Sequence, residues 1–583
     1  MSVLRKPRSV CGERPGSMVR GAIAIAAVAM LLFMSGGVDV CSASGTAGSG
    51  AVASASPAAT TVGLDILKAG GNAVDAAVST ALALAVVHPS AGNLGGGGFA
   101  VVRIGGQVAA LDFRETGPSA ATATMFLLPD GKPDPERSLV GPLASGVPGS
   151  PAGLYELHRR FGLLPWRTVV APAVRLAAEG FAVTPRLSRS VAAAQRLLTR
   201  FSETTAVWLP SGRAPAPGTA LKQPALAATL RSYAAQGPTA LTAGAAAAAI
   251  ERAARAHGGV LTAADLAAYR PVWREPVRFT AFGWNVASMP LPSSGGIILA
   301  ETTGMLERLG WSRRPVGSVD RIHLMVETWR RAFADRFLLG DPATTLAGPE
   351  QLLDRRWLDR RAAEIDGTRA TASGTVRPWP AQGTHESRET THLSVVDGAG
   401  NAVSLTTTLN GSFGCGLLVP EVGILLNNEM DDFAAAPGSP NLYGLVQGEA
   451  NAVGPGKRML SSMTPTVAWR AGEVLALGSP GGSHIPTATA QVLLNVIVDG
   501  DPLQAAVDRP RVHHQWLPDV VVAEEGALSE SVRAELIRRG HVLRPAEGIG
   551  EVDAVRRAES GALEAAADPR GPGAAGVTSG QKR

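Results

Sequence analysis

The sequence predicts an α+β fold, and three observations carry that prediction. Two Thr- and Val-rich runs flank a Gly/Asn turn between Glu389 and Asn410, which is typical of a β-hairpin. A long Ala/Leu/Arg-rich region, residues 145–380, predicts mostly helices. The chain has 583 residues, of which 45% are hydrophobic and 18% charged, so it can bury one large core or two lobes.

Residues 1–44 are predicted to be a signal peptide, which implies an exported protein of the periplasm or the medium. Basic residues near the start are followed by the apolar run Ala22–Met34 and by the small-residue stretch Cys41–Ser44. The apolar run is too short to span a membrane. Met18 is an alternative start. A lipoprotein anchored through the cysteine of that stretch is disfavoured, because Asp39 stands where a small or apolar residue is expected.

The number of cysteines and the net charge limit further which classes of protein the chain can belong to. Cys11 and Cys41 lie in the leader, which leaves Cys415 and no internal disulfide. Residues 1–44 carry five Lys/Arg and two Asp/Glu, so their removal lowers the net charge from +5 to +2. A charge this small argues against a nucleic-acid-binding protein.

The elements before the hairpin follow from periodicity and from turn residues. Residues 45–58 are a small-residue linker or an early strand, and 108–113 form a strand. Helices are expected at residues 62–68, 72–87, 152–161, 166–179, 224–235, 245–257 and 318–339. Residues 368–387 have no periodicity and form a loose connector.

A glycine run, Gly92–Phe99, stands between the second helix and the first strand. Phosphate binding is disfavoured, because no Lys-Ser/Thr pair follows the run and no strand precedes it. We expect the glycines to allow close backbone packing near a buried site.

The predicted hairpin places polar side chains together. Thr390, His392 and Ser394 share one face of its first strand. If the loop holds an odd number of residues, Thr390 lies opposite Thr408 on the second strand, and we favour this register because two facing hydroxyls are chemically useful. The alternative is that threonines are present because they favour strands.

Three stretches of sequence after the hairpin help to interpret it. They are Asn427–Phe433, Lys457–Pro465 and Gly478–Ser483. Together with Thr390-Thr391-His392 and the glycine run, they closely resemble the gamma-glutamyltranspeptidases, a family of N-terminal nucleophile hydrolases, over about residues 50–570. The resemblance implies a four-layer αββα sandwich built from both parts of a self-cleaved chain. It also implies a large subunit, 45–389, and a small subunit, 390–583, which form a heterodimer.

The resemblance implies gamma-glutamyltransferase and glutathione hydrolase activity without a cofactor. Cleavage before Thr390 makes it both nucleophile and N-terminus, and its own α-amine, with a reference pKa of about 8, can take the hydroxyl proton. A gamma-glutamyl ester then forms on Thr390 and passes to water, an amino acid or a peptide. Thr408 would orient the nucleophile, while Gly481 and Gly482 would offer backbone amides to the oxyanion.

The resemblance also assigns the substrate pocket. Arg114, with Ser461 and Ser462, binds the α-carboxylate of the donor, for which a planar guanidinium is suited. Glu429 and Asp432, aided by Asn410, face the α-ammonium group. Tyr443, in a Pro- and Gly-rich loop, is expected to contact Asn410 and close the pocket over small donors. Two residues depart from the family pattern: His484, where Arg is common, and Cys415.

Other interpretations were weighed against this one. A Ca²⁺ loop at residues 427–432 lacks alternate-residue ligands and a closing Glu. His513 and His514 would point apart on a strand, so we expect no metal site there. The functional alternatives are a cephalosporin or glutaryl acylase of the same superfamily, and a cleavage-dead amino-acid-binding protein of the cell envelope.

Overall fold

The computed structural model describes residues 48–378, 390–436 and 448–580. The predicted signal peptide, the chain directly before Thr390 and the predicted lid residue Tyr443 therefore lie outside the described residues.

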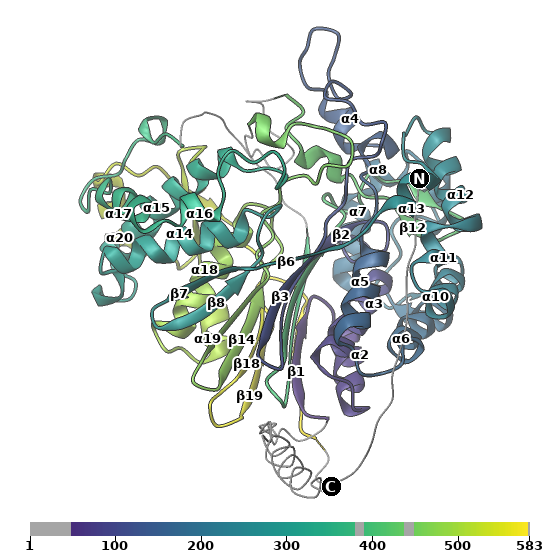
Figure 1. The fold of residues 1–583 in the computed structure, drawn as a ribbon, viewed down its shortest axis with the longest axis horizontal. Helices are drawn as coiled ribbons and strands as arrows, with labels where there is room; N and C mark the ends of the chain where they lie inside the picture. Colours follow the sequence, from purple (N-terminus) through teal and green to yellow (C-terminus); the bar gives the residue numbers. More distant parts are fainter. Residues whose placement is uncertain (1–47, 379–389, 437–447, 581–583) are drawn as a thin grey trace, which may run out of the picture. The chain divides into compact units, whose positions relative to one another are not determined.

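The predicted hairpin forms the centre of a seven-stranded antiparallel sheet (Figure 1). Its strands β9 and β10 pair with each other, β9 also pairs with β1, and β10 pairs with β2. The strands, in their order across the sheet, are β20 (Ala574–Thr578), β1 (Gly50–Ser54), β9 (Thr391–Asp397), β10 (Ala402–Thr408), β2 (Gly97–Ile104), β3 (Gln107–Phe113) and β6 (Val272–Arg274).

A second antiparallel sheet has six strands and packs on the first. Its order is β19 (Leu563–Ala566), β18 (Asp553–Arg557), β14 (Glu473–Gly478), β13 (Thr466–Arg470), β8 (Trp284–Ser288) and β7 (Val277–Ala281). Small and β-branched side chains fill the space between the sheets, among them Ala51, Val101, Val467, Ala476 and Val555. Small residues let two sheets approach face to face.

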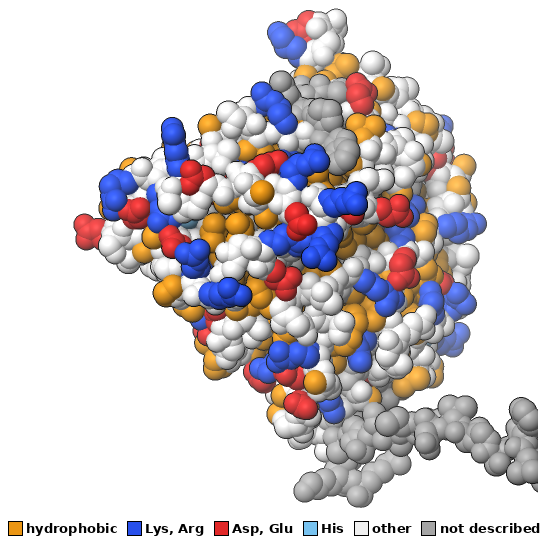
Figure 2. All heavy atoms as spheres, turned by 60° about the vertical axis from the view of Figure 1, so that its left-hand side comes forward, with side chains coloured by type: hydrophobic (Ala, Val, Ile, Leu, Met, Phe, Trp, Pro, Cys, Tyr) orange, Lys and Arg blue, Asp and Glu red, His pale blue; other side chains and the backbone are white. Residues whose placement is uncertain are grey.

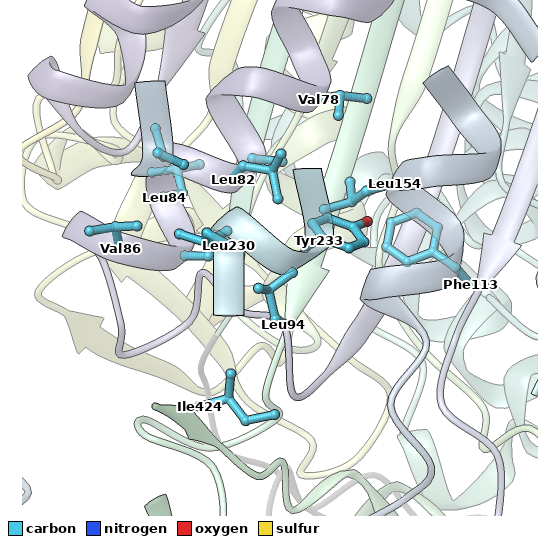
Figure 3. Packing of buried hydrophobic residues seen from close by; sticks show 14 of the residues in the cluster. Val78, Leu82, Leu84, Val86, Leu94, Phe113, Leu154, Leu230, Tyr233 and Ile424 are labelled. Atoms are coloured by element: carbon cyan, nitrogen blue, oxygen red, sulfur yellow. The ribbon is translucent and has the colours of Figure 1, made fainter. Parts of the chain in front are cut away.

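Helices cover the outer face of the first sheet, on the right of Figure 1. They include α2 (Pro57–Lys68), α3 (Ala73–Val87), α5 (Ser150–Phe161), α6 (Trp166–Glu179), α10 (Pro224–Gln236) and α12 (Gly244–Ala256). Every residue of α3 is buried, because this helix lies between the sheet and the outer helices. Figure 3 shows Leu82 and Leu84 of α3 packed near Leu230 and Tyr233 of α10.

Helices also cover the outer face of the second sheet, on the left of Figure 1. They include α14 (Gly295–Arg308), α15 (Val319–Asp335), α18 (His484–Ile497) and α19 (Leu503–Asp508). The four layers are therefore helix, sheet, sheet and helix, which confirms the predicted αββα sandwich.

Both sheets mix strands from the two sides of residue 389. In the first sheet, β1 lies between β20 and β9, and β10 pairs with β2. In the second sheet, β13 pairs with β8. Neither segment could complete a sheet alone, so the two parts of the chain form one fold.

The expected helices and the strand at residues 108–113 are confirmed within a few residues, and residues 50–54 form a strand rather than a linker. The prediction of mostly helices over residues 145–380 missed the short strands β6, β7 and β8. These strands have only three to five residues and alternate weakly, so their partners rather than their own pattern define them.

The glycine run packs closely, as expected. A β-carbon on Gly95 would lie 1.9 Å from the carbonyl oxygen of Leu425. One on Gly96 would lie 2.1 Å from the carbonyl oxygen of Thr408. The run therefore presses the backbone against the end of β10, where the candidate site begins.

On the face shown in Figure 2, acidic and basic side chains are interspersed. Among the described helices, none combines the length and the apolar character that crossing a bilayer requires.

Candidate active site

A small cavity opens where β9 begins and β10 ends. It gathers side chains from segments that are far apart in the sequence. Its lining residues are Arg114, Arg336, Thr390, Thr408, Asn410, Glu429, Asp432, Ser461, Ser462, Met463, Gly482 and Ile485. Of the predicted site residues that the structure describes, Gly481 is the one that does not line it.

The hairpin has the register that places the two hydroxyls together. Thr391 pairs with Thr407, and continuing this register by one residue sets Thr390 opposite Thr408. The Asp397 amide donates to the Asn401 carbonyl at 2.9 Å and closes an odd, three-residue loop. The preference for the odd loop is thus confirmed.

His392, two residues after Thr390, is not available as a base for the Thr390 hydroxyl. His392 Nδ1 lies 2.9 Å from Thr406 Oγ1, and Nε2 lies 3.0 Å from Ser394 Oγ, so both ring nitrogens are engaged. Burial lowers the pKa of His392 to about 3, which keeps the ring neutral. Activation of Thr390 therefore needs another base.

Arg114 is the buried positive centre of the cavity. It follows β3, its Nε donates to the Met459 carbonyl at 3.2 Å, and its two terminal nitrogens form ion pairs with Glu429 and Asp432. Glu115 Oε2 lies 3.9 Å from Arg114 Nη1. Burial alone would lower the pKa of Arg114, but these surrounding carboxylates outweigh it and raise the pKa.

Three carboxylates thus surround Arg114, and Arg336 adds a second guanidinium to the cavity lining, so the ionised groups leave one excess negative charge. Burial raises the pKa of Glu115 to about 7, because Arg114 compensates the charge only in part. Burial also raises the pKa of Glu429. A further positive group in the cavity would relieve this excess, so the arrangement favours a ligand that carries an ammonium group.

We expect Glu115→Gln to flatten the pH dependence of folding stability. The pKa of Glu115 rises from 4.5 to about 7 on folding, so its contribution is present below pH 4.5 and is lost as the pH rises toward 7. The loss is at most about 3 kcal/mol. Urea unfolding at pH 5 and pH 7.5 should show a smaller difference for Glu115→Gln than for wild type. Glu350→Gln, at an exposed position, should behave like wild type; equal pH dependence in all three proteins would contradict this.

Asn410 and the two serines enter the cavity from constrained backbone. Asn410 has a positive φ of 68°, and its amide donates to Thr408 Oγ1 at 2.8 Å. Its side-chain nitrogen donates to the Asn428 carbonyl at 3.0 Å. Ser462 Oγ is buried and has no hydrogen-bond partner among the described residues. A bound polar ligand would satisfy this hydroxyl.

Gly481 and Gly482 lie between β14 and α18. Their φ angles of 124° and 58° lie in the region that favours glycine. Because α18 begins at His484, the two amides lie at the positive end of the helix dipole. Gly482 lines the cavity, so this turn can present amide hydrogens to an oxyanion.

The two departures from the family pattern, His484 and Cys415, do not line the cavity. The buried ring of His484 packs against His513, with 4.2 Å between ring centroids. Cys415 is a buried free thiol, and burial raises its pKa to about 12, so it is not a reactive nucleophile.

The neighbouring histidines His513, at the end of β15 (Val512–His513), and His514 have structural partners. His513 contacts Thr487 Oγ1 at 2.8 Å and Gln515 Oε1 at 2.7 Å through its two nitrogens. His514 accepts a hydrogen bond from the Trp516 amide and lies 3.4 Å from Asp519. Within the described chain, neither belongs to a group that could hold a metal ion.

Sequence reasoning missed Arg336 as a residue of the cavity. It follows α15 within a region for which mostly helices were predicted, yet it is buried and lines the site. Its Nε donates to Ser294 Oγ at 3.0 Å, and that hydroxyl donates to the Ser461 carbonyl at 2.7 Å. An Arg after an amphipathic helix resembles a surface residue, so only the fold reveals its place. Met463 and Ile485 were missed for a similar reason, since apolar side chains carry no signal of a site.

The chain is similar to known proteins over most of its length. The gamma-glutamyltranspeptidase family model matches residues 59–578. The chain is 43% identical over 525 residues to the glutathione hydrolase proenzyme of Escherichia coli (strain K12), covering 89% of this chain and 90% of that protein. It is 37% identical to the acylase ACY 1 proenzyme of Pseudomonas sp. (strain SE83), covering 90% and 92%. Among solved structures, cephalosporin acylase from Bacillus halodurans matches with a TM-score of 0.81 and 30% identity, covering 92% and 97%.

Proposed function

The chain belongs to the gamma-glutamyltranspeptidase family and is a gamma-glutamyltransferase and glutathione hydrolase, and we propose that Thr390 carries the acyl group after the chain cuts itself before this residue. The observation that supports this role is the cavity itself, in which Thr390 lies with Thr408, Gly482 and the charged cluster around Arg114.

The proposed reaction begins at the hydroxyl of Thr390. The freed α-amine takes the hydroxyl proton, and the oxygen attacks the γ-carbonyl carbon of the donor. The amide bond then breaks, the departing amine receives the proton, and a gamma-glutamyl ester remains on Thr390. Water or an acceptor amine attacks this ester and restores the hydroxyl. An amine base fits the site because both nitrogens of His392 are engaged.

The tetrahedral intermediates carry a negative oxygen that needs fixed donors. We assign this role to the amides of Gly481 and Gly482. Their position before α18 adds the positive end of a helix dipole, and the glycine conformation is held by the turn rather than formed during the reaction.

The charged cluster recognises the amino-acid end of the donor in this proposal. The donor ammonium group would face Glu429 and Asp432, near Asn410, and relieve the excess negative charge. Its carboxylate would bind Arg114 together with Ser461 and Ser462, and would occupy the unsatisfied hydroxyl of Ser462. The contact of Tyr443 with Asn410 stays a prediction.

Self-cleavage would leave residues 45–389 and 390–583 as two subunits. Strands of the two segments pair with each other in both sheets, which supports a heterodimer held by main-chain hydrogen bonds. We also propose export to the periplasm or the medium, on the leader-like residues 1–44.

The donor's ammonium group separates this function from that of an acylase. We expect the purified protein to hydrolyse gamma-glutamyl-p-nitroanilide at least tenfold more efficiently than glutaryl-p-nitroanilide, which lacks the α-amine, because the glutaryl group leaves buried carboxylates unpaired. Adding a dipeptide acceptor should raise the release of p-nitroaniline. Equal efficiency on both substrates would favour the acylase instead.

A further inference from the structure

A second cluster of polar side chains lies within the helical layer over the second sheet. It comprises His323 and Glu327, one turn apart on α15, and His541, which follows α20 (Glu530–Arg538). Each offers a ligand atom within 4.8 Å of the others, and all three are buried. Arg336, at the cavity, lies nine residues beyond Glu327, which is about 13 Å along a helix. The cluster is thus separate from the catalytic residues.

The surroundings orient the imidazoles as in a metal site. His323 Nε2 lies 2.7 Å from the Asp366 carbonyl, so this nitrogen carries the hydrogen and donates it. Nδ1 therefore keeps its lone pair and faces His541 Nε2 at 2.8 Å. Metal-binding histidines usually donate their second N–H to a carbonyl or a carboxylate in this way.

The second ring nitrogen of His541 is not used in this contact. His541 Nδ1 is buried and has no hydrogen-bond partner among the described residues. It can accept the proton that Nε2 gives up when that nitrogen binds a metal.

Glu327 completes the set, although it already binds two guanidinium groups. Arg330 Nε donates to Oε1 at 3.1 Å, and Arg331 NH1 donates to Oε2 at 2.8 Å. The Thr371 amide also donates to Oε1, at 3.2 Å. A carboxylate has about four acceptor positions, so one remains on Oε2. Asp519 balances Arg330 and Glu364 lies 3.5 Å from Arg331, so the two arginines do not leave an uncompensated positive charge.

We propose that His323, Glu327 and His541 bind one Zn²⁺ ion, with water as a fourth ligand. Two imidazoles and a carboxylate form a common ligand set for this metal. In a tetrahedral site the ligand nitrogens lie about 3.3 Å apart, so the histidines must separate by about 0.5 Å. His323 and Glu327 precede residue 389, whereas His541 follows it. On the proposed self-cleavage, this zinc would link the two subunits.

To test binding, the full chain is dialysed against ZnSO₄, unbound zinc is removed, and the zinc content per chain is measured. We expect about one zinc per chain in wild type, and at least a tenfold weaker affinity in His541→Gln. His257→Gln removes an exposed histidine elsewhere and should bind zinc like wild type. X-ray absorption of the wild-type zinc complex should show two imidazole ligands at about 2.0 Å. This spectrum needs no variant. A spectrum without imidazole, or unchanged affinity in His541→Gln, would overturn the site.

A separate measurement tests whether the zinc ion links the two subunits. Zinc should raise the urea concentration at which the two subunits of the cut protein separate, in wild type and in His257→Gln but not in His541→Gln. If zinc binds without this shift, the proposed link between the subunits is wrong, while the proposed zinc site is still supported. Thr390→Ala should bind zinc equally well, because the binding residues do not depend on the cut. Zinc binding and the proposed function can therefore fail independently.

Discussion

Thr390→Ala should give a chain that stays whole on a denaturing gel and has lost at least about a thousandfold in gamma-glutamyl hydrolysis. In the proposed function two events are lost together, because the hydroxyl of Thr390 would attack the preceding carbonyl during self-cleavage and the donor during turnover. The rest of the cavity is unchanged by this substitution, so the folded precursor should still melt cooperatively.

Thr390→Ser is the matched variant, since it keeps the hydroxyl and the main-chain amine. It should mature, and N-terminal sequencing of its smaller fragment should begin Ser-Thr-His-Leu, where wild type begins Thr-Thr-His-Leu. If Thr390→Ala is cut at the same bond, the nucleophile is misassigned. A wild-type chain that is active while uncut would reject self-cleavage, and one that is uncut and inactive would favour the amino-acid-binding alternative.

Arg114→Lys should raise KM for a gamma-glutamyl donor more than tenfold, which corresponds to more than about 1.4 kcal/mol of lost binding. Lysine keeps the positive charge but presents one ammonium group in place of a planar fork. It cannot donate to Met459, Glu429 and Asp432 from the positions that Arg114 holds. Part of the lost donor affinity then comes from disorder in the carboxylates that face the donor's ammonium group. The rest comes from a weaker contact with the donor's carboxylate.

Steady-state kinetics on gamma-glutamyl-p-nitroanilide would measure this effect. Arg159→Lys, on an exposed surface of α5, serves as the control and should leave KM unchanged. Self-cleavage of Arg114→Lys should be complete, so that KM is compared between matured proteins. A matured Arg114→Lys with wild-type KM and kcat would show that Arg114 does not bind the donor.

The parts of the fold that the sequence predicted are those with strong local signals. The hairpin followed from alternation around a Gly/Asn turn, its register from the expectation that two hydroxyls face each other, and α3 from a long apolar run. Strands β7 and β8 form a short hairpin around Phe282 and Gly283 that was missed, and β6 and β8 depend on the distant strands β3 and β13 for further pairing. Local sequence carries little information about such non-local contacts.

The site was predictable where residue chemistry and family motifs coincide, and less so elsewhere. Thr390, Arg114 and Glu429 stand in recognisable blocks, and the structure brings them to one cavity. The ion pairs among Arg114, Glu429 and Asp432 could not be read from sequence, because they join segments more than 300 residues apart. Nor could the place of Arg336, which depends on how α15 ends against Ser294.

The pairing of strands from the two sides of residue 389 also bears on the order of the folding reaction. An uncut chain finds β9 beside β1 and β13 beside β8 by closing loops within one molecule. Once cut, the same pairs must meet by collision between two molecules, so refolding becomes second order and depends on protein concentration. A dilute, unfolded mature enzyme would then be trapped as fragments with exposed strand edges. The lifetime of the native state, rather than its equilibrium stability, would set how long the enzyme survives.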